Sequence, residues 1–241
     1  MTRRTRLILF GTSAVAIGAL LAWGLAGLPA FGGFYGEYGQ ILSGVAGRER
    51  HVTNVVSAIV FDYRGFDTLG EEFILFAAVM GVALLLREAR DDRERPRDEA
   101  RSDAVRAVGL AMVPATVVFG LYVVAHGYLT PGGGFQGGIA LGSGLVLLYA
   151  AGRYRALRAA SPQALVDFAE GTGAGGYAAV GVASLIAGSL YLQNFIDLGT
   201  KGTLAAGGTI PLLNGASAVA VAAGLVLLCH EFLEEVMYPD S

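Results

Sequence analysis

Long runs without a charged residue dominate this sequence and constrain its fold more than any other feature. A helix needs about 20 mostly apolar residues to cross a hydrocarbon core of roughly 30 Å. Runs of about this length without a charge occupy residues 7–28, 107–125, 134–152, 177–195 and 210–229. A hydrophobic content of 54% with 15% charged residues also fits an integral membrane protein.

A sixth apolar run, at residues 73–86, is too short to cross a membrane by itself. It is long enough only if its helix begins near Thr68, which would draw Glu71 and Glu72 toward or into the hydrocarbon. The apolar piece at 52–62 is shorter still, and we expect a partial helix that is interfacial or packed at membrane depth against protein. The predicted fold is therefore an all-α integral membrane protein of about six transmembrane helices, two plus four.

The distribution of arginines predicts the orientation and the domain organisation. Basic residues gather before the first span, after the second and after the fourth, and the intervening loops hold few. Because short cytoplasmic loops carry the excess of Lys and Arg, both termini are predicted to be cytoplasmic. A run of mixed charge at 88–105 is predicted to be a solvated linker, which divides the chain into a two-span module, 1–87, and a four-span domain, 106–241.

Composition excludes several functions. A net charge of -3 offers no cationic surface for a phosphate backbone, so we expect no nucleic acid partner. The single cysteine, Cys229, cannot form an internal disulfide or a cysteine-rich metal site. No Ser, Cys or His constellation for nucleophilic catalysis is present, and no P-loop. We therefore expect no enzymatic activity, no cofactor and no metal site.

Acidic residues cluster at the predicted start of the second span. Four acids and Arg64 lie between residues 62 and 72. One interpretation is structural: Thr68 as N-cap with Glu71 three residues later is a capping box. The other is functional, because a carboxylate at membrane depth is costly and by default marks an ion or proton path. Glu71, Asp67 and Glu72 are the candidates for such a path, while a pair of Arg64 with Asp62 or Asp67 is better explained as structural.

A glycine-rich element joins the third and fourth predicted spans. Its glycines fit the dinucleotide fingerprint GxGxxG by chance, but they open an apolar helix and do not follow a strand, so that interpretation is rejected. Pro131 suits the first turn of a helix. Gly134, Gly138 and Gly142 then recur at every fourth residue, a face that lets another helix approach closely, and packing is favoured over ligand binding.

Other polar residues lie at the ends of the predicted spans. His126 is a candidate proton relay, although a hydrogen-bonded structural histidine is the more ordinary state. His230 and Glu234 lie one helical turn apart in the segment CHEFLEE and could pair. Asn214, Asp167 and Glu170 are polar points that a water path could touch, although we do not expect them to be ligands.

The segment from Thr130 to Gly138, TPGGGFQGG, resembles the B subunit of the multisubunit Mrp-type sodium/proton antiporter, MnhB. The likeness covers about residues 106–238. The segment FDYRGFDTLGE, from Phe61 to Glu71, resembles the C-terminal end of the large A subunit of the same antiporter, which corresponds to the E subunit of energy-converting hydrogenases. Finding both on one chain indicates a fusion of an E-like module to a B subunit.

The resemblance implies a subunit of a prokaryotic plasma-membrane complex that exchanges Na⁺ for H⁺. Its partners would be the lipid bilayer, the large A and D antiporter-like subunits, and other small subunits. Glu71 and Asp67 match a functional element of the A subunit. A role in antiport or assembly is implied for the residues that match the B subunit, namely Pro131, Gly132, Gly133, Gly134 and Phe135.

Two other functions remain open from the sequence. The chain could belong to the membrane arm of an energy-converting hydrogenase or a related respiratory complex, in which redox work drives ion pumping. It could also be a scaffold through which no ion passes. A free-standing transporter is disfavoured, because the spans show no inverted repeat and few buried charges.

Overall fold

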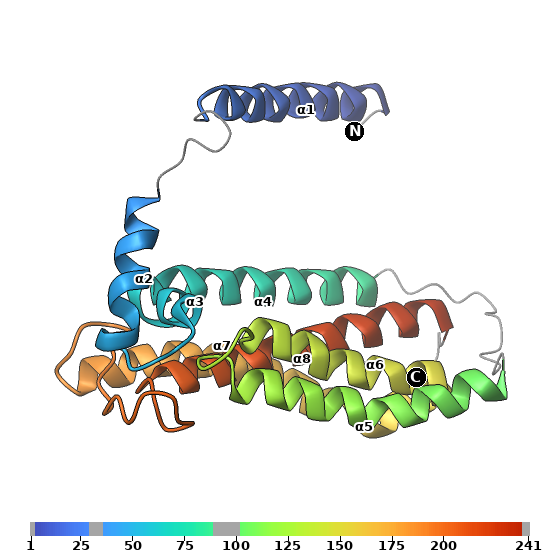
Figure 1. Cartoon of the computed structure of the whole chain (residues 1–241). Coiled ribbons are helices and arrows are strands. Elements are labelled where there is room, and N and C mark those ends of the chain that lie inside the picture. Colours follow the sequence, from blue (N-terminus) through green and yellow to red (C-terminus); the bar gives the residue numbers. More distant parts are fainter. Residues whose placement is uncertain (1–2, 29–35, 89–101, 238–241) are drawn as a thin grey trace. The chain divides into compact units, whose positions relative to one another are not determined.

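The computed structural model describes residues 3–28, 36–88 and 102–237, and these residues form helices joined by irregular segments (Figure 1). No strand occurs among the described residues, which confirms the all-α prediction. The elements are α1 (Arg3–Ala26), α2 (Glu37–Glu49), α3 (Val55–Ala58), the π-helix η1 (Ile59–Tyr63), α4 (Gly65–Glu88), α5 (Asp103–Ala125), α6 (Gly134–Ala160), α7 (Gln163–Ile186) and α8 (Ile210–Met237). Most of the predicted linker at 88–105 lies outside the described residues.

The chain divides into two compact units, Met1–Ile41 and Leu42–Ser241. The first holds α1, in which Phe10–Ala26 is an apolar stretch somewhat shorter than a full span. In the second, α8 packs against α6, α7 and α4, and α5 packs against α6. Within the described residues, four helices of this unit are long and apolar enough to cross a membrane: Gly65–Leu86, Asp103–Ala125, Gly134–Ala160 and Ile210–Leu233.

The fifth predicted span, 177–195, is wrong in its position. The helix there is α7, which begins at Gln163 and ends at Ile186. Gly188 follows with a φ of +79°, and its amide donates to the carbonyl of Leu185 over 3.0 Å. A glycine in the left-handed region is a common helix stop. The apolar residues beyond it are not helical, and Leu192 enters the core from an irregular segment.

The apolar piece at 52–62 packs against protein, which is one of the two arrangements expected for it. Residues 55–63 form α3 and η1, and Val52, Ala58 and Phe61 are buried in one cluster with Tyr177 and other core residues. Asn54 caps α3 by accepting a hydrogen bond from the Val56 amide over 3.1 Å. This short stretch is thereby fixed beside the start of α4.

The capping box at Thr68 is also wrong. Helix α4 begins at Gly65, so Thr68 lies inside its first turns, and its hydroxyl donates to the carbonyl of Val60 over 2.6 Å. Only Arg64, with φ −129°, interrupts the helical path from η1 into α4. The prediction that the helix includes Glu71 and Glu72 is confirmed.

Glycines let α6 lie directly against α8. A Cβ atom on Gly134 would lie 2.3 Å from the Asn214 carbonyl oxygen, and one on Gly138 would lie 2.8 Å from that of Ala218. At Gly142 the nearest contact would be Leu225 Cδ2, at 2.9 Å. Because these separations leave no room for a methyl group, the predicted small-residue packing face is confirmed.

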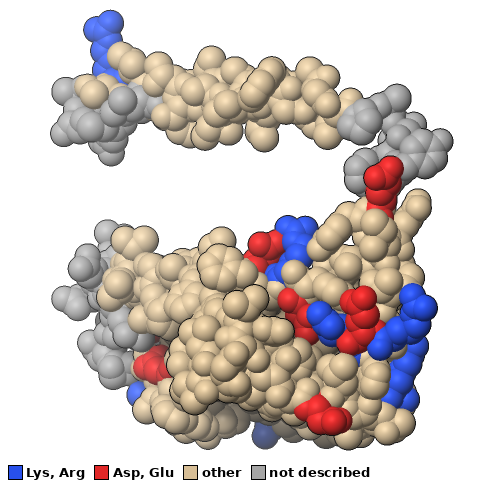
Figure 2. Space-filling model, turned by 90° about the vertical axis from the view of Figure 1, so that its left-hand side faces the viewer, with Lys and Arg blue, Asp and Glu red and all other residues tan. Residues whose placement is uncertain are grey.

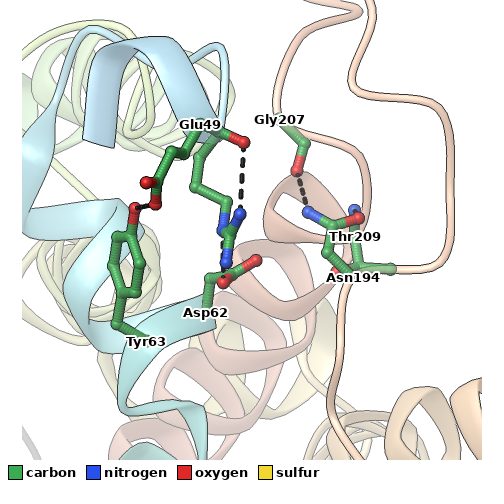
Figure 3. A network of polar contacts seen from close by, with 7 residues as sticks. Glu49, Asp62, Tyr63, Asn194, Gly207 and Thr209 are labelled. Atoms are coloured by element: carbon green, nitrogen blue, oxygen red, sulfur yellow. Dashed lines mark hydrogen bonds and ion pairs between the residues drawn. The ribbon is translucent and has the colours of Figure 1, made fainter. Parts of the chain in front are cut away.

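The two ends of the second unit differ in structure. We call the end formed by residues 42–64, 126–133 and 187–209 the loop end. There the amides of Thr53 and Asn54 donate to the Tyr128 carbonyl, at 3.2 and 3.1 Å, and Asn194 ties its segment to Gly207 and Thr209 (Figure 3).

At the opposite end, residues 153–163 meet 230–231. The helix axis of α6 breaks at Arg153, with φ +67°, next to the predicted end of its span at Gly152. His230 lies 2.9 Å from the Ser161 hydroxyl and edge-on to the Tyr154 ring. The side chain of Glu234, the predicted partner of His230, lies outside the described residues.

A candidate ion site near the loop end

A cavity of about 240 Å³ brings together the two sequence elements singled out above. It lies where η1 and α4 meet the glycine-rich turn that precedes α6. Glu71 and Thr68 line it from α4, and the turn lines it from the other side. The full lining is Val56, Ser57, Val60, Phe61, Thr68, Glu71, Gly132, Gly133, Gly134, Phe135 and Gln136.

Two consecutive carboxylates of α4 point in different directions. Glu71 is exposed and lines the cavity, whereas Glu72 is 1% exposed and faces the interior of the bundle. The Ser217 hydroxyl of α8 lies near the Glu72 carboxylate, outside the geometry of a full hydrogen bond. Within the described part of the chain, neither carboxylate oxygen of Glu72 has a well-formed hydrogen bond. A buried carboxylate in that state is costly unless a proton or a cation occupies it.

Asn214 of α8 is a second polar residue inside the bundle, and it lies beside the glycine turn. Its Nδ2 donates to the carbonyl of Val124 over 2.7 Å, and its Oδ1 has no hydrogen-bond partner in the described residues. A Cβ on Gly127 would lie 3.1 Å from that oxygen and one on Gly133 would lie 3.7 Å from it. Asn214 and Ser217 are one turn apart on α8, so they form one polar strip that leads from the turn to Glu72.

The glycine turn has a conformation that only glycine adopts easily. Gly133 has φ +147° and precedes the first residue of α6, Gly134. Pro131 therefore lies ahead of the helix, and the prediction that it occupies the first helical turn is wrong. A Cβ on Gly132 would lie 3.0 Å from the Val123 carbonyl oxygen, so the turn folds tightly over the end of α5. Phe135 and Gln136 complete its side of the cavity.

The other charged residues of the acidic cluster form ion pairs, one exposed and one partly buried. Arg64 Nε donates to Asp67 Oδ2 over 2.6 Å, and both side chains are exposed. Asp62 accepts from Arg50, not from Arg64. Figure 2 shows acidic and basic side chains close together at this end of the second unit.

Tyr63 belongs to the same surface network. Its hydroxyl donates to Glu49 over 2.6 Å, and the Arg50 guanidinium lies over its ring (Figure 3). Burial, aided by the hydrogen bond to Glu49, raises the pKa of Tyr63 to about 12. This network holds the segment before η1 in place.

His126, the candidate proton relay, is not among the residues that line the cavity beside Glu71. It follows the last residue of α5, stacks on the Tyr122 ring at 4.3 Å between centroids, and has Nδ1 3.3 Å from the Tyr122 carbonyl oxygen. These contacts are those of a structural histidine that ends a helix.

The structure also buries two carboxylates that the sequence patterns mark only weakly. Glu170 of α7 is 2% exposed and Glu231 of α8 is 1% exposed. Glu170 has mostly small or apolar neighbours in the sequence, which could have marked it as buried. The predicted span at 177–195 began after Glu170 and therefore did not include it. Glu231 is one of three acids in the segment CHEFLEE, and the sequence does not distinguish it from the other two.

These features define an all-helical, multi-pass membrane protein that holds carboxylates inside its helix bundle. Comparison with known families gives a more specific answer. A family model described as a domain related to the MnhB subunit of Na⁺/H⁺ antiporters matches residues 104–227, and a model described as the E subunit of MBH matches residues 3–102. The chain belongs to the MnhB-related family, and it is a membrane subunit of the cation/proton antiporter type.

Two individual relatives are also similar to this chain. An uncharacterised protein of Methanocaldococcus jannaschii is 30% identical over 215 residues, covering 76% of this chain and 80% of the relative. The A/B subunit of a probable K⁺/H⁺ antiporter of Rhizobium meliloti is 36% identical over 131 residues, which is 45% of this chain and 13% of that much longer protein.

Two solved structures have the same fold. A chain of the membrane-bound sulfane sulfur reductase, an archaeal respiratory membrane complex, matches with a TM-score of 0.73 and 32% identity, covering 95% of this chain and 98% of that one. A chain of the Mrp complex from Dietzia matches with a TM-score of 0.70 and 22% identity over 96% of this chain and 26% of that one, which shows the fold alone.

Proposed function

We propose that this chain contributes to the ion path of a Na⁺/H⁺ antiporter complex through the cavity beside Glu71 and the buried carboxylate of Glu72. The other subunits, including large antiporter-like ones, complete the path, and the chain has no catalytic activity or cofactor of its own. It resides in a prokaryotic plasma membrane with both termini cytoplasmic. Its loop end, which holds the cavity, then faces outward.

One observation carries this proposal. Glu71 and Glu72 are neighbours on α4, and together they connect an open cavity to an interior site that lacks full hydrogen bonding. A purely structural pair of acids inside a helix would be expected to bind arginines or other hydrogen-bond donors. Here Arg64 pairs with Asp67 instead. The arrangement therefore supports transfer of a proton or small cation between the cavity and the bundle interior.

A second function is favoured by a specific likeness. The match to the sulfane sulfur reductase chain extends over nearly the whole of both chains at 32% identity. A place in the membrane arm of a redox-driven respiratory complex is therefore the alternative, with the same ion path driven by electron transfer. The scaffold alternative has no comparable support, because a scaffold does not require Glu72 to be buried.

Glu71→Gln tests the cavity directly. Removing the charge should slow sodium-driven proton movement in proteoliposomes that hold the assembled complex, because the cavity would attract cations and protons less strongly. The control is Asp103→Asn, which removes another exposed carboxylate, in the first turn of α5, and should leave transport near the wild-type rate. Equal rates for both variants and wild type would refute a role for the cavity.

A further inference from the structure

Polar groups continue from Glu72 along one stripe of α8 to the opposite end of the bundle. Ser217, Gly224 and Glu231 are spaced seven residues apart, so they lie on nearly the same face of the helix, about 10 Å from one to the next. Glu72 lies beside Ser217, and Glu170 Oε1 lies 3.7 Å from the position of a Cβ on Gly224. Glu231 Oε1 accepts a hydrogen bond from Gln163 Nε2 over 3.2 Å.

Helix α7 shows the same spacing from its own side. Gln163 and Glu170 are also seven residues apart, so the antiparallel helices α7 and α8 run in register over this stretch. The three buried carboxylates Glu72, Glu170 and Glu231 therefore lie at three successive levels of the bundle. Each is no more than 2% exposed.

Glu170 is the unexplained member of this row. Its Oε1 is buried and has no hydrogen-bond partner among the described residues. The absence of a side chain at Gly224 makes room for it beside Val79 of α4. Val166, one turn earlier on α7, and Val226 of α8 belong to the buried apolar cluster at this level. A structural carboxylate would be expected to have a donor here, since burial without one is expensive.

We propose that Glu170 is a proton-binding site midway through the bundle, between Glu72 and the end that holds Glu231. The inference rests on the proposed function of Glu72 and extends it into the MnhB-related domain. A proton fits better than a cation, because a hard cation requires several oxygen ligands and the side chains around Glu170 are apolar. The carboxylate takes up one proton to form a carboxylic acid and returns to the carboxylate on releasing it. Water that enters the row transiently would bridge the gaps.

The charged groups nearest to Glu170 influence the pH at which it binds a proton. They are Asp167, exposed one turn earlier on α7, Glu72 on α4 and Glu231 on α8. An apolar groove lined by Val166, Ala169, Ala223 and Val226 reaches the same level from the outside of the helices. Val166 and Ala169 flank Glu170 on α7, so an apolar reagent in this groove would lie beside the residues that bury its carboxyl group.

The first test uses the wild-type complex and needs no variant. Dicyclohexylcarbodiimide reacts with protonated carboxyl groups in apolar surroundings, and mass spectrometry locates the adduct. We expect labelling of Glu170 that falls as the pH is raised, with little labelling of Asp167. Absence of an adduct on Glu170 at every pH tested would overturn the proposal.

The second test compares Glu170→Gln with Asp103→Asn in the reconstituted complex, because Asp103 is an exposed acid in the first turn of α5. Glu170→Gln should abolish proton movement and leave assembly intact, whereas Asp103→Asn should leave both near wild type. Normal transport by Glu170→Gln combined with slow transport by Glu71→Gln would refute the Glu170 site alone. Normal transport by both would refute the proposed function as well. If Glu170→Gln does not assemble, the labelling of the wild-type complex decides.

Discussion

Replacing Glu72 by glutamine is expected to lower cation-driven proton movement to the level of membranes that lack the complex. Glutamine has nearly the same size, so the packing of α4 against α8 is retained, but it cannot bind and release a proton. The neighbouring carboxylate, Glu71, is exposed and lines the cavity, so it does not replace Glu72 beside Ser217. Transport in inverted vesicles, followed with a pH-sensitive dye, measures the effect.

Assembly of the Glu72→Gln complex must be shown in the same preparation by copurification of the other subunits. Asp103→Asn is the matched control, because Asp103 is an exposed acid in the first turn of α5. Full transport by an assembled Glu72→Gln complex would mean that Glu72 is only a buried acid and that ions pass elsewhere.

Replacing Gly138 is expected to destabilise the helix bundle strongly. An alanine Cβ would lie 2.8 Å from the Ala218 carbonyl oxygen and 2.9 Å from Val221 Cβ, so α6 and α8 must separate. Overpacking of this kind costs about 1–3 kcal/mol. Gly138→Leu would require a much larger displacement and should prevent accumulation of the assembled complex.

Thermal unfolding of the detergent-solubilised complex measures the alanine variant, and blue-native electrophoresis measures the leucine variant. Gly175→Ala is the control, since no atom lies within 4 Å of its added Cβ. That change should be neutral or stabilising by up to about 1 kcal/mol, because alanine favours a helix over glycine. Equal unfolding temperatures for the two alanine variants would contradict the packing shown for α6 and α8.

Hydropathy predicted the helices well where a charge-free run coincided with a helix. The run at 210–229 lies inside α8, and the run at 134–152 ends where α6 breaks at Arg153. It failed for α7, because Asp167 and Glu170 interrupt the apolar pattern and the non-helical residues after Gly188 prolong it. Hydropathy records how apolar a segment is, and it does not record whether a buried acid lies in a helix.

The candidate site was predictable in part. The sequence pointed to Glu71 and to the glycine turn separately, and only the folded chain shows that both line one cavity. Glu71 and Glu72 point in different directions because consecutive residues of a helix are about 100° apart, and only the folded chain shows which of them faces the bundle. Glu170 could not be singled out, because its importance depends on Gly224 and Val79, which lie far away in the sequence.

The central claim is that this chain works within a cation/proton antiporter complex. Purification of the tagged chain from its native membrane in mild detergent, followed by mass spectrometry, tests this most directly. We expect large antiporter-like subunits and several small membrane subunits, without redox proteins. Recovery with iron–sulfur or nickel–iron subunits would place the chain in a redox-driven complex, and recovery of the chain alone would contradict the account.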